Sequence, residues 1–208
     1  MSVYIALLRG VNVSGHRMMK MDALREAMTQ AGCDSVQTYI QSGNAVFRYA
    51  GDPSPSRLAD GEDRSAQGDA AVPETTAGSL RERIEGAIGT RFGFTVPIAL
   101  RSLSELETVL AQSPYPFDGL QTGEELYVAM LVDDPAPQRV ANLLALADAS
   151  SSETDSFQVA DGRLYILYRQ RVHQSRLTNA WFERQAGVAA TTRNWRTLST
   201  LYEMARKL

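Results

Sequence analysis

The chain has 208 residues, a mass of 22.8 kDa and a formal net charge of -3 at pH 7, which excludes a globally basic nucleic-acid coat protein. Its hydrophobic content of 44% and charged content of 22% are ordinary for globular domains, so a fully disordered or fibrous protein is also excluded. The single cysteine, Cys33, excludes a disulfide framework and a cysteine-rich zinc site, and two histidines leave little material for a metal centre.

No apolar segment approaches the roughly 18 residues that a membrane-spanning helix needs. The first residues, Met1–Tyr4, begin a strand-like segment rather than the charged start of a signal peptide. A lone cysteine fits a reducing compartment. We therefore expect a cytoplasmic protein without a membrane partner.

The first half of the sequence predicts a β-α-β-β-α-β unit. An apolar run predicts a buried strand over residues 3–8, and apolar residues at helical spacing predict a helix over residues 24–31. Alternating residues then predict two hairpin strands joined by a Ser-Gly-Asn turn. A capping-box pair, Ser79 and Glu82, precedes a second helix, and alternation predicts a strand over residues 94–100. This order is the ferredoxin-like arrangement, in which two helices cover one face of an antiparallel sheet.

Residues 51–77 interrupt this unit with a sequence rich in Gly, Pro, Ser, Ala and Asp. Such a composition cannot bury enough apolar surface to offset the entropy cost of ordering it, so we expect a flexible, dispensable insertion. A second capping box, Ser102 with Glu105, begins a helix that Pro114 and Pro116 end. We predict that this helix connects the two halves of the chain.

The second half repeats the pattern of the first. Its predicted elements are a strand over 126–132, a helix over 140–147, two strands around the Asp-Gly turn at 161–162, a helix over 175–185, a strand over 188–192 and a further helix over 198–205. We therefore predict an α+β fold of two tandem ferredoxin-like (βαββαβ) subdomains with antiparallel sheets, plus an extra C-terminal helix. The predicted boundaries are 1–101 for the N-terminal subdomain, 102–121 for the connecting helix and linker, and 122–208 for the C-terminal subdomain with its terminal helix.

The segment between the first strand and the first helix is the first candidate site. It is longer than the two to six residues usual for such a connection, and excess length is typical of functional loops. Its glycines permit close approach of a ligand, its Asn and Ser side chains offer neutral hydrogen bonds, and its basic residues suit an anion. The alternative is a structural loop held by its own Asn and Ser side chains. The candidate ligand-binding residues here are Arg9, Asn12, Ser14, Gly15, Arg17 and Lys20.

The segment Thr191–Arg196 is the second candidate site. Asn194 is the predicted N-cap of the last helix, which places Arg193 and Arg196 at the positive end of that helix. Cations there oppose the helix dipole by up to about 1 kcal/mol each, so either a bound anion or an internal carboxylate would stabilise them. We predict that this segment and the first loop form one anion site.

The sequence shows no catalytic set. His16 and His173 each lie beside basic residues without an acid partner, and Cys33 has no adjacent histidine that would activate it. Catalytic residues and cofactors are therefore unknown, and no metal site is predicted.

Several stretches of the sequence resemble the bacterial family known only as domain of unknown function 1697. The hallmarks of that family are LLRGINVGG, a Lys-Met pair, TYIQSGNVVF, Ser-Lys-Leu and T-x-RNW-x-T. They correspond here to Leu7–Gly15, Lys20-Met21, Thr38–Phe47, Ser175–Leu177 and Thr191–Thr197. This sequence departs from those hallmarks at Val11 (Ile in the family), Ser14 (Gly) and Arg176 (Lys), and by the insertion after Tyr49. The resemblance implies the paired ferredoxin-like architecture and no established activity, and its stretches add Ser42, Asn44 and Arg176 to the candidate ligand-binding residues.

The charges suggest three functions. Residues 102–161 contain 11 acidic and one basic residue, whereas residues 162–208 contain nine basic and two acidic residues. We predict binding of an anionic ligand between basic loops, either a phosphorylated small molecule, a nucleotide or a nucleic acid, although the aromatic signature of RNA-recognition sheets is absent. The alternatives are an enzyme acting on a small anionic metabolite at the subdomain interface, and an assembly module whose acidic and basic segments pair with each other or in a homo-oligomer.

Overall fold

The structure is a computed structural model that describes the chain except for residues 14, 52, 54–78, 150–154 and 161–162. Ser14 of the first candidate site, most of the predicted insertion and the Asp-Gly turn lie outside the described residues. The predictions made for them stay predictions.

The first half forms a four-stranded antiparallel sheet. Its strands are β1 (Ser2–Leu8), β2 (Asp34–Thr38), β3 (Asn44–Tyr49) and β4 (Ile98–Ser102), in the spatial order β2-β3-β1-β4. Helices α1 (Met21–Gln30) and α2 (Leu80–Phe92) cover one face of the sheet and share an apolar core with it. Strand β4 begins later than the predicted residue 94, because Pro97 has no N–H with which to continue the ladder.

Both predicted capping boxes are confirmed. The Ser79 hydroxyl accepts from the Glu82 N–H at 3.3 Å, and the Glu82 carboxylate accepts from the Ser79 N–H at 2.7 Å. Ser102 and Glu105 make the same two hydrogen bonds at 3.2 and 2.7 Å. These pairs satisfy N–H groups that a helix start leaves without an intrahelical partner, and they fix the starts of α2 and of α3 (Leu103–Ala111).

The second half forms a sheet of the same topology. Its strands are β5 (Glu125–Leu131), β6 (Ser156–Ala160), β7 (Arg163–Tyr168) and β8 (Ala190–Asn194), in the order β6-β7-β5-β8. Helices α4 (Pro137–Asp148) and α5 (Asn179–Ala186) cover one face, and α6 (Trp195–Arg206) follows. Helix α5 begins later than the predicted residue 175 because Thr178, in an extended conformation, is its N-cap. The fold is therefore two tandem ferredoxin-like units with a C-terminal helix, as predicted.

The two halves also correspond beyond the predicted units. Helix α3 follows β4 as α6 follows β8, so the predicted connecting helix and the C-terminal helix occupy equivalent positions. The strand registers agree as well, because β1 pairs Leu8 with Ile98 and β5 pairs Leu131 with Ala190.

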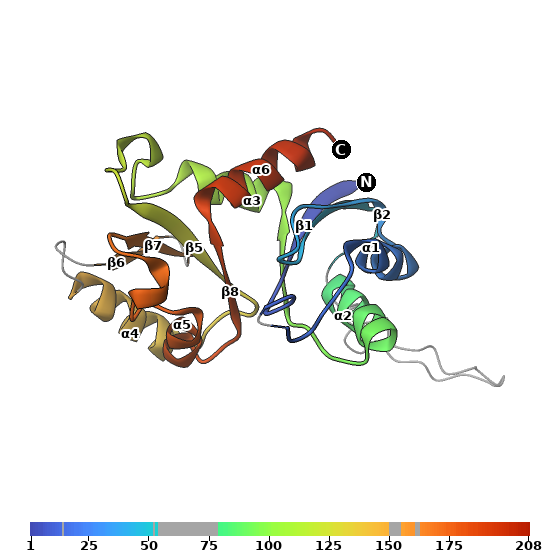
Figure 1. Cartoon of the computed structure of the whole chain (residues 1–208), viewed down its shortest axis with the longest axis horizontal. Coiled ribbons are helices and arrows are strands. Elements are labelled where there is room, and N and C mark those ends of the chain that lie inside the picture. Colours follow the sequence, from blue (N-terminus) through green and yellow to red (C-terminus); the bar gives the residue numbers. More distant parts are fainter. Residues whose placement is uncertain (14, 52, 54–78, 150–154, 161–162) are drawn as a thin grey trace, which may run out of the picture.

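A shared apolar core joins the two halves. In Figure 1, α1 and α2 lie on the outer side of one sheet, α4 and α5 lie on the outer side of the other, and α3 and α6 lie side by side above the junction. One continuous cluster contains buried side chains from β1, β3, β5, α3 and α6, with Leu7, Val128 and Leu201 among them. The inner sheet faces are therefore covered by the protein itself. Among the described residues, no helix combines the length and the apolarity needed to cross a bilayer.

Candidate functional site

The side chain of Asn12 joins the β1–α1 loop to the turn between β2 and β3 by hydrogen bonds. Its Nδ2 group donates to the carbonyl oxygens of Met19 at 2.9 Å and of Gln41 at 2.7 Å. Its Oδ1 atom accepts from the Met19 N–H at 2.7 Å. The backbone φ of Asn12 is 55°, a left-handed conformation that asparagine tolerates better than most residues. Asn12 therefore organises the loop through hydrogen bonds within the protein.

The β1–α1 loop and the turn between β2 and β3 both expose apolar side chains. The side chains of Val13, Met18 and Ile40 are 57%, 65% and 51% exposed, respectively. Ile40 has a φ of 50°, which is unusual for a β-branched residue, and Arg17 has a φ of 48°. Strained backbone of this kind persists only where the surroundings hold it, and it is often found at functional sites.

Basic side chains lie among these apolar ones on the same loop. His16 and Lys20 are exposed, and Arg17 is half-buried beside Gly10, where an added Cβ would lie 3.6 Å from Arg17 Nη1. In the described part of the chain, the side chains of Arg17 and Lys20 have no hydrogen-bond or ion-pair partner. We use the term loop surface for Val13, His16, Arg17, Met18, Lys20 and Ile40.

Arg193 is half-buried between the two halves, and all of the N–H groups of its guanidinium have acceptors in the protein. Its Nε donates to Asn44 Oδ1 at 2.5 Å. Its Nη1 donates to Thr191 Oγ1 at 2.6 Å and to the Thr192 carbonyl at 3.0 Å. Its Nη2 donates to the carbonyls of Leu8, Ser42 and Gly43, at 2.8, 3.0 and 3.3 Å. Burial lowers the pKa of Arg193 to about 10, so the group stays charged at neutral pH. All the acceptors are neutral oxygens. Arg193 is therefore not paired with an internal carboxylate, which was one of the two alternatives that the sequence allowed. Arg193 has no donor left for a ligand.

The Ser-Gly-Asn turn supplies three of the oxygen atoms that bind Arg193. Asn44 is fully buried, and its Nδ2 donates to the Tyr39 carbonyl at 3.1 Å and to Ser42 Oγ at 2.9 Å. Gly43 has a φ of 74°, and a Cβ there would lie 2.4 Å from a methyl group of Val11. The turn therefore requires glycine, and it joins the second candidate segment to the first half of the chain through Arg193.

Arg9 is paired with Glu183 of α5. Its Nη2 donates to Glu183 Oε2 at 2.6 Å, and its Nε donates to Glu183 Oε1, which also accepts from the Ala190 N–H at 2.9 Å. Burial by itself would raise the pKa of Glu183, but these hydrogen bonds outweigh it and leave the pKa below the ordinary value of 4.5. The ion pair therefore neutralises Arg9 across the junction of the two halves.

We expect the Arg9–Glu183 pair to stabilise the fold in a pH-dependent way. Because the folded pKa of Glu183 lies below the unfolded value of 4.5, its contribution is present above that pH and is lost as the pH falls through the lowered value. Glu183→Gln should therefore reduce the loss of stability below about pH 4.5, measured by urea denaturation at a series of pH values. Glu203→Gln, which changes an exposed carboxylate, is the control and should keep the wild-type pH dependence. An unchanged acid limb in Glu183→Gln would contradict the expectation.

Three predicted residues lie away from the loop surface. Asn194 caps α6, since its Oδ1 accepts from the Thr197 N–H at 2.8 Å. Asn194 and Arg196 line a separate cavity of about 680 Å³ together with Trp195, and no residue of the β1–α1 loop lines it. Arg176 is exposed in the segment before α5. Their roles as ligand contacts stay predictions.

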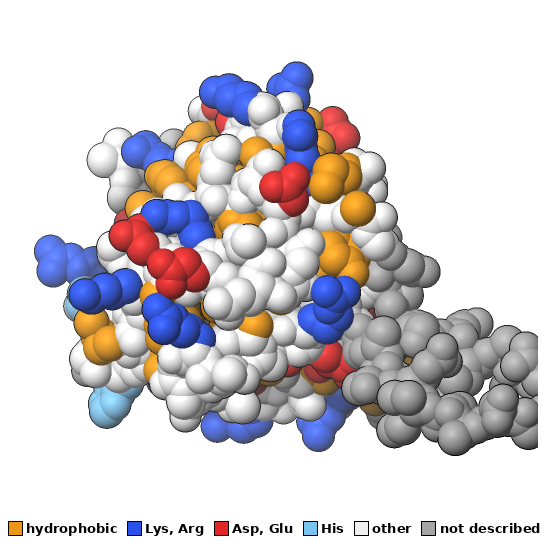
Figure 2. All heavy atoms as spheres, turned by 90° about the vertical axis from the view of Figure 1, so that its right-hand side faces the viewer, with side chains coloured by type: hydrophobic (Ala, Val, Ile, Leu, Met, Phe, Trp, Pro, Cys, Tyr) orange, Lys and Arg blue, Asp and Glu red, His pale blue; other side chains and the backbone are white. Residues whose placement is uncertain are grey.

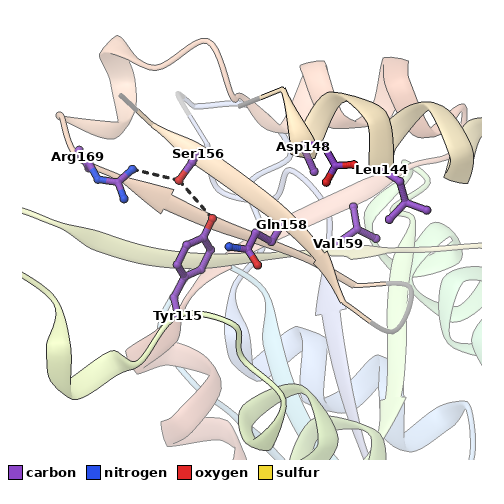
Figure 3. Close-up of a pocket in the computed structure, with 8 residues that line it drawn as sticks. Tyr115, Leu144, Asp148, Ser156, Gln158, Val159 and Arg169 are labelled. Carbon is purple, nitrogen blue, oxygen red and sulfur yellow. Dashed lines mark hydrogen bonds between the residues drawn. The ribbon is translucent and has the colours of Figure 1, made fainter. Parts of the chain in front are cut away.

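A further cavity of about 440 Å³ lies beside α4 and β6. In Figure 3, Ser156 Oγ lies between the Tyr115 hydroxyl, at 3.2 Å, and Arg169 Nη1, at 3.1 Å. Arg169 also pairs with Glu124 at 3.1 Å, which joins the basic C-terminal segment to the acidic middle segment. No imidazole or carboxylate is among the described partners of Ser156 Oγ, so nothing there activates it as a nucleophile.

Among the described residues, the remaining reactive groups form no metal-binding cluster, and the thiol of Cys33 is not activated. Cys33 is buried, and burial raises the pKa of its thiol to about 12, which keeps it protonated. Within the described ranges, no three His, Cys, Asp or Glu side chains come close enough to hold a metal ion. Sequence reasoning missed Glu183 as the partner of Arg9, because the two residues lie 174 positions apart and no local pattern connects them. It also missed the exposed Val13, Met18 and Ile40, although their apolar character in loops was a visible signal.

Comparison with known proteins identifies the fold and the family. A conserved bacterial protein from Streptococcus pneumoniae has a similar structure, with a TM-score of 0.62, 18% sequence identity and coverage of 99% of both chains. A second solved structure, described as a candidate glycine cleavage system transcriptional repressor, covers 92% of this chain and 95% of its own at 13% identity, but its TM-score of 0.21 is too low to indicate a shared fold. A search of curated proteins found no significant match. The model of the family described as protein of unknown function (DUF1697) matches residues 1–63 and 66–165, so the chain belongs to that family.

Proposed function

We propose that the protein binds a small anionic ligand, such as a nucleotide or another phosphorylated molecule with an apolar portion, at the loop surface. The observation that carries this proposal is the pair of cations Arg17 and Lys20, whose side chains have no partner among the described residues, beside exposed apolar side chains on loops that Asn12 holds in place. A phosphate can accept charge-assisted hydrogen bonds from the cations, while Val13, Met18 and Ile40 can cover an apolar or aromatic portion. Helix α1 begins directly after Lys20, and its free N–H groups add to the attraction for an anion.

The fold favours a small ligand over a nucleic acid. RNA-recognition sheets stack bases on an open sheet face, whereas the inner faces of both sheets here are packed in the shared core and the outer faces are covered by helices. A backbone track also needs a continuous row of cations. Figure 2 shows basic side chains interspersed with acidic and apolar ones on the face of the first half. The loop surface therefore suits one or two phosphate groups.

We expect at least one nucleotide or phosphosugar to raise the melting temperature of the wild-type protein in a thermal-shift screen at low salt. A ligand at 100 times its dissociation constant stabilises the folded state by about 2.7 kcal/mol. Arg17→Ala combined with Lys20→Ala should weaken binding of that ligand at least about tenfold, measured by titration calorimetry, because each substitution removes a charge-assisted hydrogen bond.

The matched control is Arg206→Ala combined with Lys207→Ala, which removes the same charge at the end of α6 and should leave the affinity unchanged. A single-stranded oligonucleotide in the same screen tests the nucleic-acid alternative, and tighter binding of it than of any small phosphate compound would contradict the proposal. Equal affinity in wild type and in the loop-surface variant would contradict it as well.

A further inference from the structure

The two halves meet at two junctions that correspond residue by residue. The residue after β1 is Arg9, and the residue after β5 is Val132. The Arg9 N–H donates to the Pro97 carbonyl at 2.9 Å, and the Val132 N–H donates to the Ala189 carbonyl at 2.8 Å. Arg9 and Val132 therefore occupy equivalent backbone positions.

Each junction also holds a glutamate in an equivalent place. Glu183 Oε1 accepts from the N–H of Ala190, the first residue of β8, at 2.9 Å. Glu85 Oε1 accepts from the N–H of Ile98, the first residue of β4, also at 2.9 Å. Each glutamate thus accepts the same hydrogen bond, from the first N–H of the strand that follows its helix.

The junctions differ in what faces the carboxylate. Arg9 reaches across to Glu183 and pairs with it through two N–H groups. Val132 stands at the equivalent position opposite Glu85 and has no charge to offer. In the described part of the chain, Glu85 Oε2 has no hydrogen-bond partner. Both junctions therefore contain a guanidinium–carboxylate pair, Arg9 with Glu183 in one and Arg81 with Asp133 in the other, but the equivalent glutamate is paired only in the first of these.

A cavity lies beside Glu85 and Val132. It has a volume of about 630 Å³ and is lined by Glu85 and Val132 together with Arg81, Asp133 and residues of α2 and the loops around it. Arg81 makes its hydrogen bonds to other groups, since its Nη1 donates to Asp133 Oδ1 at 2.5 Å and to the Val132 carbonyl at 2.7 Å, and its charge acts on Glu85 without a hydrogen bond between them. The three charged side chains that line the cavity therefore carry one net negative charge, which belongs to Glu85.

The α2 side of the cavity is open. Gly86 and Gly89 both line it, and a Cβ at either position would meet nothing within 4 Å. Glycine inside a helix is destabilising relative to alanine, and neither glycine has a close neighbour among the described residues that would exclude a side chain. A volume in this range is typical of small-molecule sites.

We propose that this cavity binds the guanidinium group of a small alkylguanidinium ligand, with Glu85 as the residue that pairs with it. The ligand supplies to Glu85 the guanidinium that Arg9 supplies to Glu183. Burial raises the pKa of Glu85, and the Ile98 N–H and the charge of Arg81 offset only part of that rise, whereas the paired Glu183 has a lowered pKa. Glu85 thus lacks the direct hydrogen bonds to a guanidinium that Glu183 has.

The test uses butylguanidine as the probe and butylurea as its neutral counterpart of similar shape. We expect butylguanidine to bind the wild-type protein in a calorimetric or NMR titration, and butylurea to bind at least about tenfold more weakly. Glu85→Gln keeps an acceptor for the Ile98 N–H but removes the charge, and it should weaken butylguanidine binding at least about tenfold. Glu203→Gln removes an exposed carboxylate of α6 and should leave binding unchanged.

A second variant tests the equivalence of the junctions directly. Val132→Arg places an arginine where the other half has Arg9, so its guanidinium should pair with Glu85, abolish butylguanidine binding and raise the melting temperature. Equal binding of butylguanidine and butylurea, unchanged binding in Glu85→Gln, or full binding in Val132→Arg would each overturn the proposal. Absence of binding to the wild-type protein at millimolar probe would overturn it too. None of these results depends on the loop surface.

Discussion

We expect Arg193→Ala to lower the free energy of unfolding by about 3 to 5 kcal/mol. The substitution removes the guanidinium and leaves six oxygen acceptors without its N–H groups, including the fully buried Asn44 and the carbonyl at the end of β1. Buried acceptors that lose their donor keep the cost of desolvation without the hydrogen bond. Urea denaturation monitored by circular dichroism measures the effect.

Two variants serve as comparisons for Arg193→Ala. Arg101 is the equivalent arginine of the first half, since Ile5 pairs with Arg101 as Val128 pairs with Arg193. It donates to the carbonyls of Leu131 and Leu100, at 2.6 and 2.7 Å, so Arg101→Ala should also destabilise, but by less because fewer acceptors are left unpaired.

Arg196→Ala removes an exposed charge three residues beyond Arg193, and it should change stability by no more than about 0.5 kcal/mol. A loss below about 1 kcal/mol in Arg193→Ala, similar to that in Arg196→Ala, would show that Arg193 does not hold the two halves together.

We expect Leu201→Ala to destabilise both halves together, by about 2 to 5 kcal/mol. Leu201 lies on α6 and is fully buried in the shared core, and α6 packs against β1 and β3 of the first half as well as β5 and β8 of the second. The cavity left by the substitution therefore weakens the contact of each sheet with its neighbour. Leu144→Ala, at a half-exposed position on α4, is the control and should cost less than about 1 kcal/mol.

The position of the tryptophans makes the coupling of the halves measurable. Trp181 and Trp195 are the only tryptophans of the chain and both lie in its second half, so tryptophan fluorescence reports on that half while circular dichroism reports on the whole chain. We expect the two signals to give the same urea midpoint in the wild type and in Leu201→Ala. A separate transition seen only by circular dichroism would instead support two independently folding subdomains with the predicted boundaries.

The candidate site was only partly predictable from the sequence. Basic residues, loop length and position before a helix indicated the β1–α1 loop and Thr191–Arg196 as candidate sites. In the structure, Arg193 contacts the last residue of β1 and the turn between β2 and β3. The sequence pattern could not show how the basic groups are used. Arg9 pairs with Glu183 and Arg193 with neutral oxygens, whereas Arg17 and Lys20 have no such partner among the described residues.

The sequence by itself determined the order of the strands and helices, the two capping boxes, the Asn194 cap and the ferredoxin-like class, because periodicity, caps and turns depend on residues within a few positions of each other. Only the tertiary structure decided that the inner sheet faces close on each other, and that of the two equivalent glutamates Glu183 is paired with an arginine whereas Glu85 is not. The reason is physical. These features depend on contacts such as those of Arg193 with Asn44 and of Arg9 with Glu183, 149 and 174 positions apart, which form only when the two sheets pack together.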